Sequence, residues 1–135
     1  MINSPYLNSK DYTLLNVKLG SVYLFDTYIV TEFNEGVDIN FDNFDEVTQI
    51  IKNHYENRSF GFIANRLNSY SIDLTDATKF NANFPNLKAY AIVVYNTLTE
   101  RVFEIENHFF EFNREAFKTL EHAAEWVEQT LLSEN

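Results

Sequence analysis

One stretch of the chain, from Arg66 to Thr75, concentrates side chains that could bind an anion or accept a phosphate. A phosphate on one of its hydroxyls would add about −1.5 to −2 charges, which Arg66 and the N-terminus of a following helix would stabilise. Alternatively, these hydroxyls only close turns and cap that helix, as Ser, Thr and Asp commonly do. The candidate binding or phosphorylation residues here are Arg66, Asn68, Ser69, Tyr70, Ser71, Asp73 and Thr75.

A second segment resembles the start of a calcium-binding loop. Its alternate positions hold Asp38, Asn40 and Asp42, which match the first three oxygen ligands of such a loop. The match ends there, because the sixth position is Asn43 instead of glycine and the twelfth is Gln49 instead of glutamate. We therefore expect no metal at this loop.

The remaining residue types offer no constellation for catalysis. The three histidines, His54, His108 and His122, fall on three different predicted helices without a partner at metal-ligand spacing. The chain has no cysteine and only three glycines, so it lacks a thiolate nucleophile and a glycine-rich phosphate loop. We expect a protein that is not an enzyme and needs no cofactor.

Charge and composition exclude some classes of binding partner. Twenty acidic against ten basic residues give a net charge of −10, which repels nucleic acids and anionic membrane surfaces. No apolar run approaches the roughly 18 residues of a membrane span, so we expect a cytoplasmic location. The 13 Phe and 8 Tyr either line a ligand pocket or fill the core, and the second use is the commoner one.

The first third of the chain predicts a meander of short strands. Apolar residues alternate from Leu15 to Leu19, and two apolar runs follow at 22–25 and 28–33. A shorter alternating segment at 37–41 closes the series. The polar residues 1–9 are expected to be flexible, and residues 10–132 to form a single domain.

Two later runs, 60–64 and 89–95, predict central strands, because they are apolar at nearly every position. Helix-length segments separate them, so we expect them to pair in parallel through right-handed crossovers. A last short strand is expected at 115–118. Tyr95 and Asn96 end the second central strand and are added to the candidate binding residues, since ligands of α/β sheets bind at this edge.

The period of apolar residues predicts about four helices between and after these strands. Two begin with a capping-box pattern, Asn43 with Glu46 and Thr97 with Glu100. A short one is expected at 75–81, and Thr119 caps the last. The core-facing stripes are predicted to be Phe44, Val47, Ile51 and Tyr55, then Leu98, Val102, Ile105 and Phe109, and finally Leu120, Ala124, Val127 and Leu131. The fold class is therefore α/β, with a mixed sheet of antiparallel N-terminal and parallel central strands.

One string carries a resemblance to a known family. The segment 117–127, FKTLEHAAEWV, is similar to the ending of SpoIIAA-like proteins of the bacterial STAS group, and the match covers roughly residues 12–131. The resemblance implies a SpoIIAA-like fold and a signalling role in protein interaction. In that group the segment 65–73 would hold a phosphorylatable serine, although the Asp-Ser-Ser-Gly-like sequence is absent here.

Two functions follow as hypotheses. The first is a non-enzymatic regulatory or protein-interaction domain that binds a protein partner through residues 66–75 and the adjacent helix. The alternative is a carrier of a small apolar ligand or lipid. It would use a cavity between the sheet and the helices at 97–109 and 119–131, near Tyr90, Phe103, Phe109 and Trp126.

Overall fold

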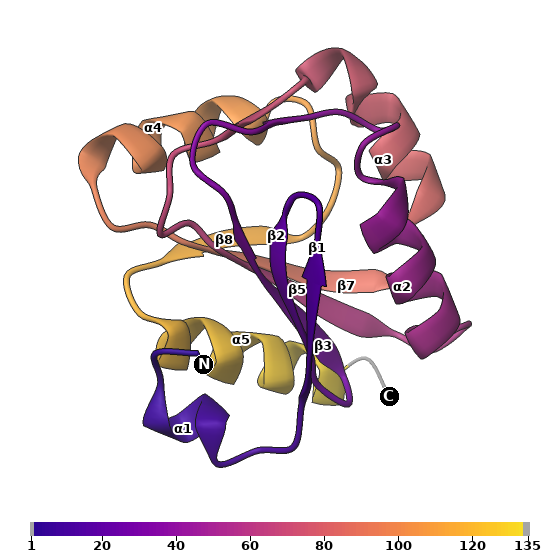
Figure 1. The fold of residues 1–135 in the computed structure, drawn as a ribbon, viewed down its shortest axis with the longest axis vertical. Coiled ribbons are helices and arrows are strands. Elements are labelled where there is room, and N and C mark those ends of the chain that lie inside the picture. Colours follow the sequence, from indigo (N-terminus) through magenta and orange to yellow (C-terminus); the bar gives the residue numbers. More distant parts are fainter. Residues whose placement is uncertain (1, 134–135) are drawn as a thin grey trace.

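The apolar runs form a six-stranded sheet in the computed structural model, which describes residues 2–133 (Figure 1). The antiparallel strands at one edge and the parallel strands that follow confirm the predicted mixed sheet. The strands lie in the order β1 (Thr13–Val17), β2 (Gly20–Leu24), β3 (Tyr28–Phe33), β5 (Phe60–Asn65), β7 (Leu87–Val93) and β8 (Arg114–Phe117).

The two predicted central strands are confirmed. β5 and β7 pair in parallel with Ile63 beside Ala91, and every residue of β5 is buried. The second strand ends at Val93, so Tyr95 lies beyond it. Continuous apolar sequence is what a strand covered on both faces requires, which is why these two runs could be identified.

The segment 37–41 does not continue the meander, and that prediction was wrong. Its strand β4 (Asp38–Ile39) pairs in parallel with β6 (Ser71–Ile72) in a separate two-stranded sheet. β3 already has a neighbour on each side, β2 and β5, so no edge of it remains free for pairing. The hydrogen bonds of β4 therefore go to the loop that follows β5.

The helices form two layers, one on each face of the sheet. From β3 the parallel strands are added in one direction, so right-handed crossovers put all their helices on one face. Figure 1 shows α2, α3 and α4 on that face and α1 and α5 on the other. The helices are α1 (Pro5–Asn8), α2 (Asp45–Tyr55), α3 (Ala77–Asn83) after the 3-10 turn η1 (Leu74–Asp76), α4 (Thr97–Glu106) and α5 (Leu120–Ser133).

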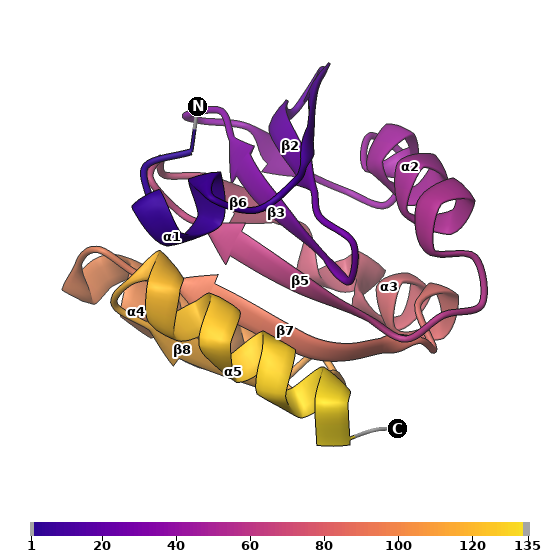
Figure 2. The ribbon, with the colours of Figure 1, turned by 90° about the horizontal axis from the view of Figure 1, so that it is seen from below.

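Small residues let α5 lie close to the sheet. Figure 2 shows α5 running along β7, and Ala89 and Ala91 of that strand are fully buried beneath it. A side chain on Gly61 of β5 would collide with Val127 of α5. The predicted inner residues of α5 are all buried, and Thr119 accepts a hydrogen bond from the amide of His122, as the predicted cap requires.

Residues 2–9, which were expected to be flexible, pack against the α5 layer. Ile2 and Leu7 are fully buried, and the Ser4 hydroxyl donates a hydrogen bond to Glu121 of α5 at 3.0 Å. The segment reads as polar, but its two large apolar residues cover part of the sheet face that α5 leaves open.

The two capping-box predictions were wrong. The Asn43 side chain accepts from the amide of Asn40 instead, and Glu46 accepts from the amide of Lys18. At α4 the cap is Asn96, whose oxygen accepts from the amide of Thr99 at 2.8 Å. Both patterns have the spacing of a capping box. At α2 Asn43 and Glu46 bind other amides, and at α4 the side chain of Asn96 takes the capping role.

We expect Tyr28→Phe and Tyr55→Phe to differ in stability. Burial raises the pKa of both phenols. The Tyr55 hydroxyl donates to the Phe25 carbonyl at 2.9 Å, whereas the buried Tyr28 hydroxyl has no hydrogen-bond partner among residues 2–133. Losing the Tyr55 bond should cost about 1 kcal/mol, and the Tyr28 variant should be at least as stable as the parent. Urea unfolding measures both, and an equal loss in the two variants contradicts this account.

Candidate functional site

The face that α4 turns to the sheet is the reverse of the one that its apolar period predicts. Leu98, Ile105 and Phe109 are 69%, 54% and 47% exposed, so the prediction that this stripe faces the core was wrong. The inner positions belong to Phe103 and Glu106, which are buried. Apolar residues lie on both sides of this helix, so periodicity alone could not select one.

A buried ion cluster sets the rotation of α4. The carboxylate of Glu106 accepts two hydrogen bonds from Arg66, at 3.1 and 2.9 Å, and a third from Arg114 at 3.0 Å. All three side chains are at most 3% exposed. Glu106 is the last residue of α4, Arg66 follows β5, and Arg114 begins β8, so the cluster joins three elements distant in sequence.

Aromatic rings surround both guanidinium groups. Arg66 lies 4.6 Å from the ring centre of Tyr70, and Arg114 lies 4.6 Å from that of Tyr90. Arg114 also lies about 5 Å from the rings of Phe103 and Phe110. Such stacking stabilises a guanidinium away from water. The cluster holds two positive charges and one negative charge.

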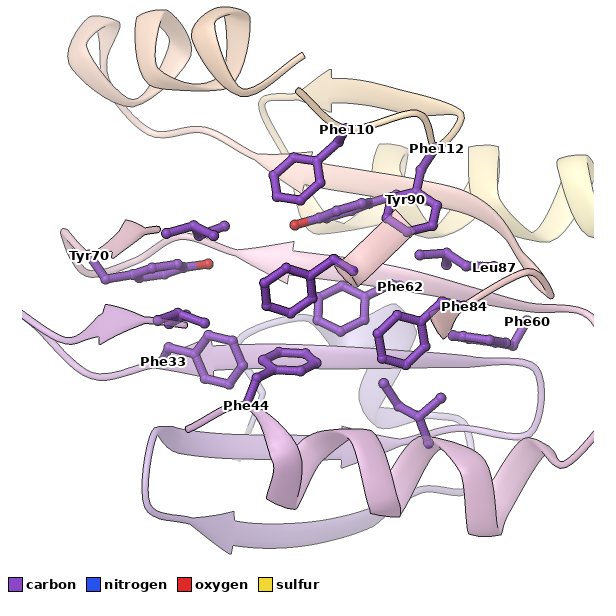
Figure 3. A pocket seen from close by; sticks show the side chains of 14 residues that line it. Phe33, Phe44, Phe60, Phe62, Tyr70, Phe84, Leu87, Tyr90, Phe110 and Phe112 are labelled. Atoms are coloured by element: carbon purple, nitrogen blue, oxygen red, sulfur yellow. The ribbon is translucent and has the colours of Figure 1, made fainter. Parts of the chain in front are cut away.

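Tyr70 and Tyr90 also line an apolar cavity between the sheet and helices α2 and α3 (Figure 3). The cavity leaves about 50 Å³ in which the centre of a water-sized sphere can move. Ten of its fourteen lining residues are aromatic. The lining residues are Phe33, Ile39, Phe44, Ile51, Phe60, Phe62, Tyr70, Ile72, Phe80, Phe84, Leu87, Tyr90, Phe110 and Phe112.

This cavity is not where the carrier hypothesis put it. The helices at 97–109 and 119–131 lie on opposite faces of the sheet, so no space between them and the sheet is shared. Trp126 packs on Phe117 on the α5 face, whereas Tyr90 and Phe103 belong to the other face. Crossover handedness places α4 on one face, whereas α5 follows the last strand, β8, and covers the other face.

The segment 66–75 divides into a buried and an exposed part. Arg66 is buried and bound to Glu106, so the expectation that it meets a phosphate at the surface was wrong. Asn68 donates to the Phe33 carbonyl at 2.9 Å and ties the loop to β3, and Ser69 is exposed. The loop does open to solvent at the carboxyl edge of the sheet.

The hydroxyls of this segment make local hydrogen bonds. Ser71 donates to the carboxylate of Asp38 at 2.8 Å, and Thr75 donates to that of Asp73 at 2.7 Å. Asp73 also accepts from the Thr75 amide and so caps η1; the bond from the Thr75 hydroxyl, and after it the bond from the amide, lowers the pKa of Asp73. These contacts agree with the turn-closing alternative, and phosphorylation of Ser69, Ser71 or Thr75 stays a prediction.

Tyr95 and Asn96 do not share a site with Arg66 and Tyr70. The Tyr95 hydroxyl donates to Asn65 at 2.6 Å, and Asn65 donates in turn to Glu32 at 2.7 Å. Asn65 alternates with Ile63 and lies on the α5 side of the sheet. Asn96 serves as the cap of α4.

The acidic segment after β3 is also used locally. Asp38 accepts from Ser71, and Asn40 accepts from the amide of Asn43 at 2.7 Å. Within residues 2–133, no three or more His, Asp or Glu side chains form a group that could hold a metal ion. No helix in that range is both long and apolar enough to cross a membrane.

Sequence reasoning missed Glu106, Arg114 and the cavity-lining residues Phe110 and Phe112. A signal was present, because Glu106 stands three residues after Phe103 and four before Phe110, a spacing that predicts a shared face. A lone glutamate between two phenylalanines is unusual on a core face unless a basic partner meets it.

We expect Glu106→Gln to cost about 3–5 kcal/mol of unfolding free energy, because it leaves two buried guanidinium groups without a counter-charge. The triple variant Arg66→Met, Glu106→Leu, Arg114→Met should regain most of that loss, since apolar side chains of similar volume replace the whole cluster. Chemical unfolding followed by circular dichroism measures both. A Glu106→Gln variant as stable as the parent would show that the cluster is not a stabilising contact.

A second prediction concerns alkaline pH. Burial raises the pKa of Tyr70 to about 12, and the Arg66 guanidinium opposes part of that rise. The neutral Tyr70 phenol stabilises the fold fully below pH 10, which is the ordinary pKa of tyrosine. This stabilisation is lost as the pH rises through 12, because Tyr70 deprotonates first in the unfolded chain. Tyr70→Phe should remove on the order of 1 kcal/mol of the stability loss across this range. Unfolding midpoints at several pH values test it; an unchanged slope contradicts it.

Comparisons with known proteins support the fold and leave the role open. No protein-family model matches the chain, and no curated protein matches its sequence. Among solved structures, the chain is similar to an uncharacterized protein of the DUF3478 family with a SpoIIAA-like fold from Shewanella loihica. The TM-score is 0.57 at 12% identity, over 87% of this chain and 92% of that one. At this identity the likeness concerns the fold alone, and the chain has the SpoIIAA-like fold that its sequence resemblance implied.

Proposed function

We propose that the chain is a non-enzymatic interaction domain of STAS type, which binds a protein partner through the outer face of α4. The observation that carries this proposal is the α4 stripe, formed by Leu98, Val102, Ile105 and Phe109, whose first, third and fourth members are about half exposed or more. Large apolar side chains gathered along one exposed helix face are typical of interaction surfaces.

The geometry of the stripe fits a groove in the partner. Leu98, Val102 and Ile105 follow each other at three- and four-residue spacing and form a ridge along the helix, and Phe109 lies in the turn just after its end. An amphipathic helix that enters an apolar groove presents anchors at this spacing. Because the ion cluster holds the opposite face of α4, the ridge is rigidly displayed to solvent.

Charge indicates the chemistry of the partner. Glu100 and Glu104 are exposed on α4 beside the stripe, and the whole chain carries a net charge of −10. A partner whose apolar groove has a basic rim would complement both features. A second copy of the chain is a poorer match, since two such surfaces repel each other.

The loop after β5 provides a neighbouring contact region. Leu67 is 52% exposed and Tyr95 is 48% exposed, at the ends of the adjacent strands β5 and β7. Tyr95 stands two residues before α4 begins. The first sequence hypothesis placed the partner surface at this edge, residues 66–75. Because Arg66 is buried, the exposed Leu67 and Tyr95 are the residues that a partner would contact there.

We expect Ile105→Glu to weaken partner binding by about tenfold or more, because a charge replaces a central apolar anchor. Leu132→Glu is the matched control, since Leu132 is 72% exposed on α5 at the opposite face. Photo-crosslinking groups placed at positions 105 and 132 in the native cells, followed by mass spectrometry, identify what contacts each face. Binding of the purified partner is then measured for parent and variants at low and high salt.

The proposal predicts a single partner that is crosslinked from position 105, is lost with Ile105→Glu, is retained with Leu132→Glu and binds more weakly at high salt. Equal binding by both variants contradicts it. A crosslink between two copies of the chain would also contradict it, in favour of self-association.

The cavity favours a second candidate function, the carrier of a small apolar ligand. Fourteen side chains, ten of them aromatic, surround a space that the packed core leaves open. Buried apolar cavities lined by aromatic rings are common sites for small molecules. The cavity lies on the α2 and α3 side of the sheet and does not involve the exposed side of the α4 stripe.

A further inference from the structure

The ion cluster has an excess of positive charge. Arg66 and Arg114 share the one carboxylate of Glu106, and within residues 2–133 no other carboxylate lies within ion-pair distance of either arginine. The Nε atom of Arg114 is buried, and none of the residues that the structure describes accepts a hydrogen bond from it. An unbalanced charge away from water is costly, so an anion that reached this region would be bound favourably.

Two tyrosines connect this charge to the cavity. The rings of Tyr70 and Tyr90 stack on Arg66 and Arg114 respectively, and both rings line the cavity. Figure 3 shows their hydroxyl groups pointing toward each other from opposite sides. Neither hydroxyl donates a hydrogen bond to a described protein acceptor, so both are free to donate to a ligand oxygen.

The rest of the cavity suits an apolar body. In Figure 3 the space extends from Tyr70 and Phe33 at one end to Phe60 and Phe84 at the other. Away from the two hydroxyls it is lined by Phe, Ile and Leu side chains. The shape favours an elongated molecule with one polar end.

A surface groove supplies a way in. Ile51, Phe60 and Phe84 line both the cavity and a groove that opens beside Lys52 and Asn83. The Lys52 ammonium lies 5.8 Å from the ring centre of Phe84. Groove and cavity therefore adjoin at these three side chains, and a ligand larger than the space of about 50 Å³ that is open in this structure requires them to move.

We propose that the cavity binds a small apolar carboxylic acid, whose carboxylate accepts hydrogen bonds from Tyr70 and Tyr90 and balances the charge of Arg66, Glu106 and Arg114. The proposal rests on the carrier function and adds the chemical class of the ligand. It is independent of the partner surface on α4.

Calorimetric titration of the full chain with octanoate and with octan-1-ol tests the proposal, since the two probes share a chain and differ in charge. Octanoate should bind about tenfold more tightly than the alcohol, the usual gain from hydrogen bonds to a charged group. Arg114→Met should remove that preference and leave the binding of octan-1-ol unchanged. Arg101→Met, which removes an exposed arginine of α4, is the matched control and should bind octanoate as the parent does.

Circular dichroism establishes that each variant is folded. Should Arg114→Met not fold, Tyr70→Phe replaces it, because that change removes one donor and keeps the ring; octanoate binding should then fall severalfold with octan-1-ol unaffected. Equal binding of the two probes by the parent overturns the acid class and leaves the carrier function standing. Absence of binding by both probes overturns the carrier function as well. Undiminished octanoate preference in both variants overturns the assignment of the site.

Discussion

The pairing of Glu106 with Arg66 and Arg114 is the interaction on which the rest of this structure depends. The pairing fixes the end of α4 to the residue after β5 and to the first residue of β8. Since a buried carboxylate must keep its partners, α4 cannot rotate to bury its more apolar side. The exposed stripe and the charged end of the cavity are therefore two consequences of one constraint.

Both proposals use features that would otherwise be costly. Covering the exposed Leu98 and Ile105 with a partner would lower the free energy of the system. An anion that neutralised the excess guanidinium charge would do the same. The cluster holds the inner face of α4, whose outer face carries the stripe, and its arginines stack on Tyr70 and Tyr90, which line the cavity.

The parts of the fold that could be predicted are those that local sequence determines. The central strands at 60–64 and 89–95, the inner face of α2 and the cap at Thr119 follow from unbroken apolar runs, period and a hydroxyl at a helix start. The cap at Asn96 was missed by one residue, because Asn96 and Thr97 offer similar oxygens and only backbone geometry chooses between them.

The candidate site was harder to predict, for a physical reason. From the sequence alone came the mixed sheet with its two parallel central strands, the polar loop at the carboxyl edge and a SpoIIAA-like fold. Tertiary structure alone decided that Arg66 is buried, that 97–109 and 119–131 cover opposite faces, and that Glu106 instead of Ile105 points inward. Periodicity reports which residues share a helix face, whereas charge partners 40 positions away in the chain decide which of two apolar faces meets the sheet.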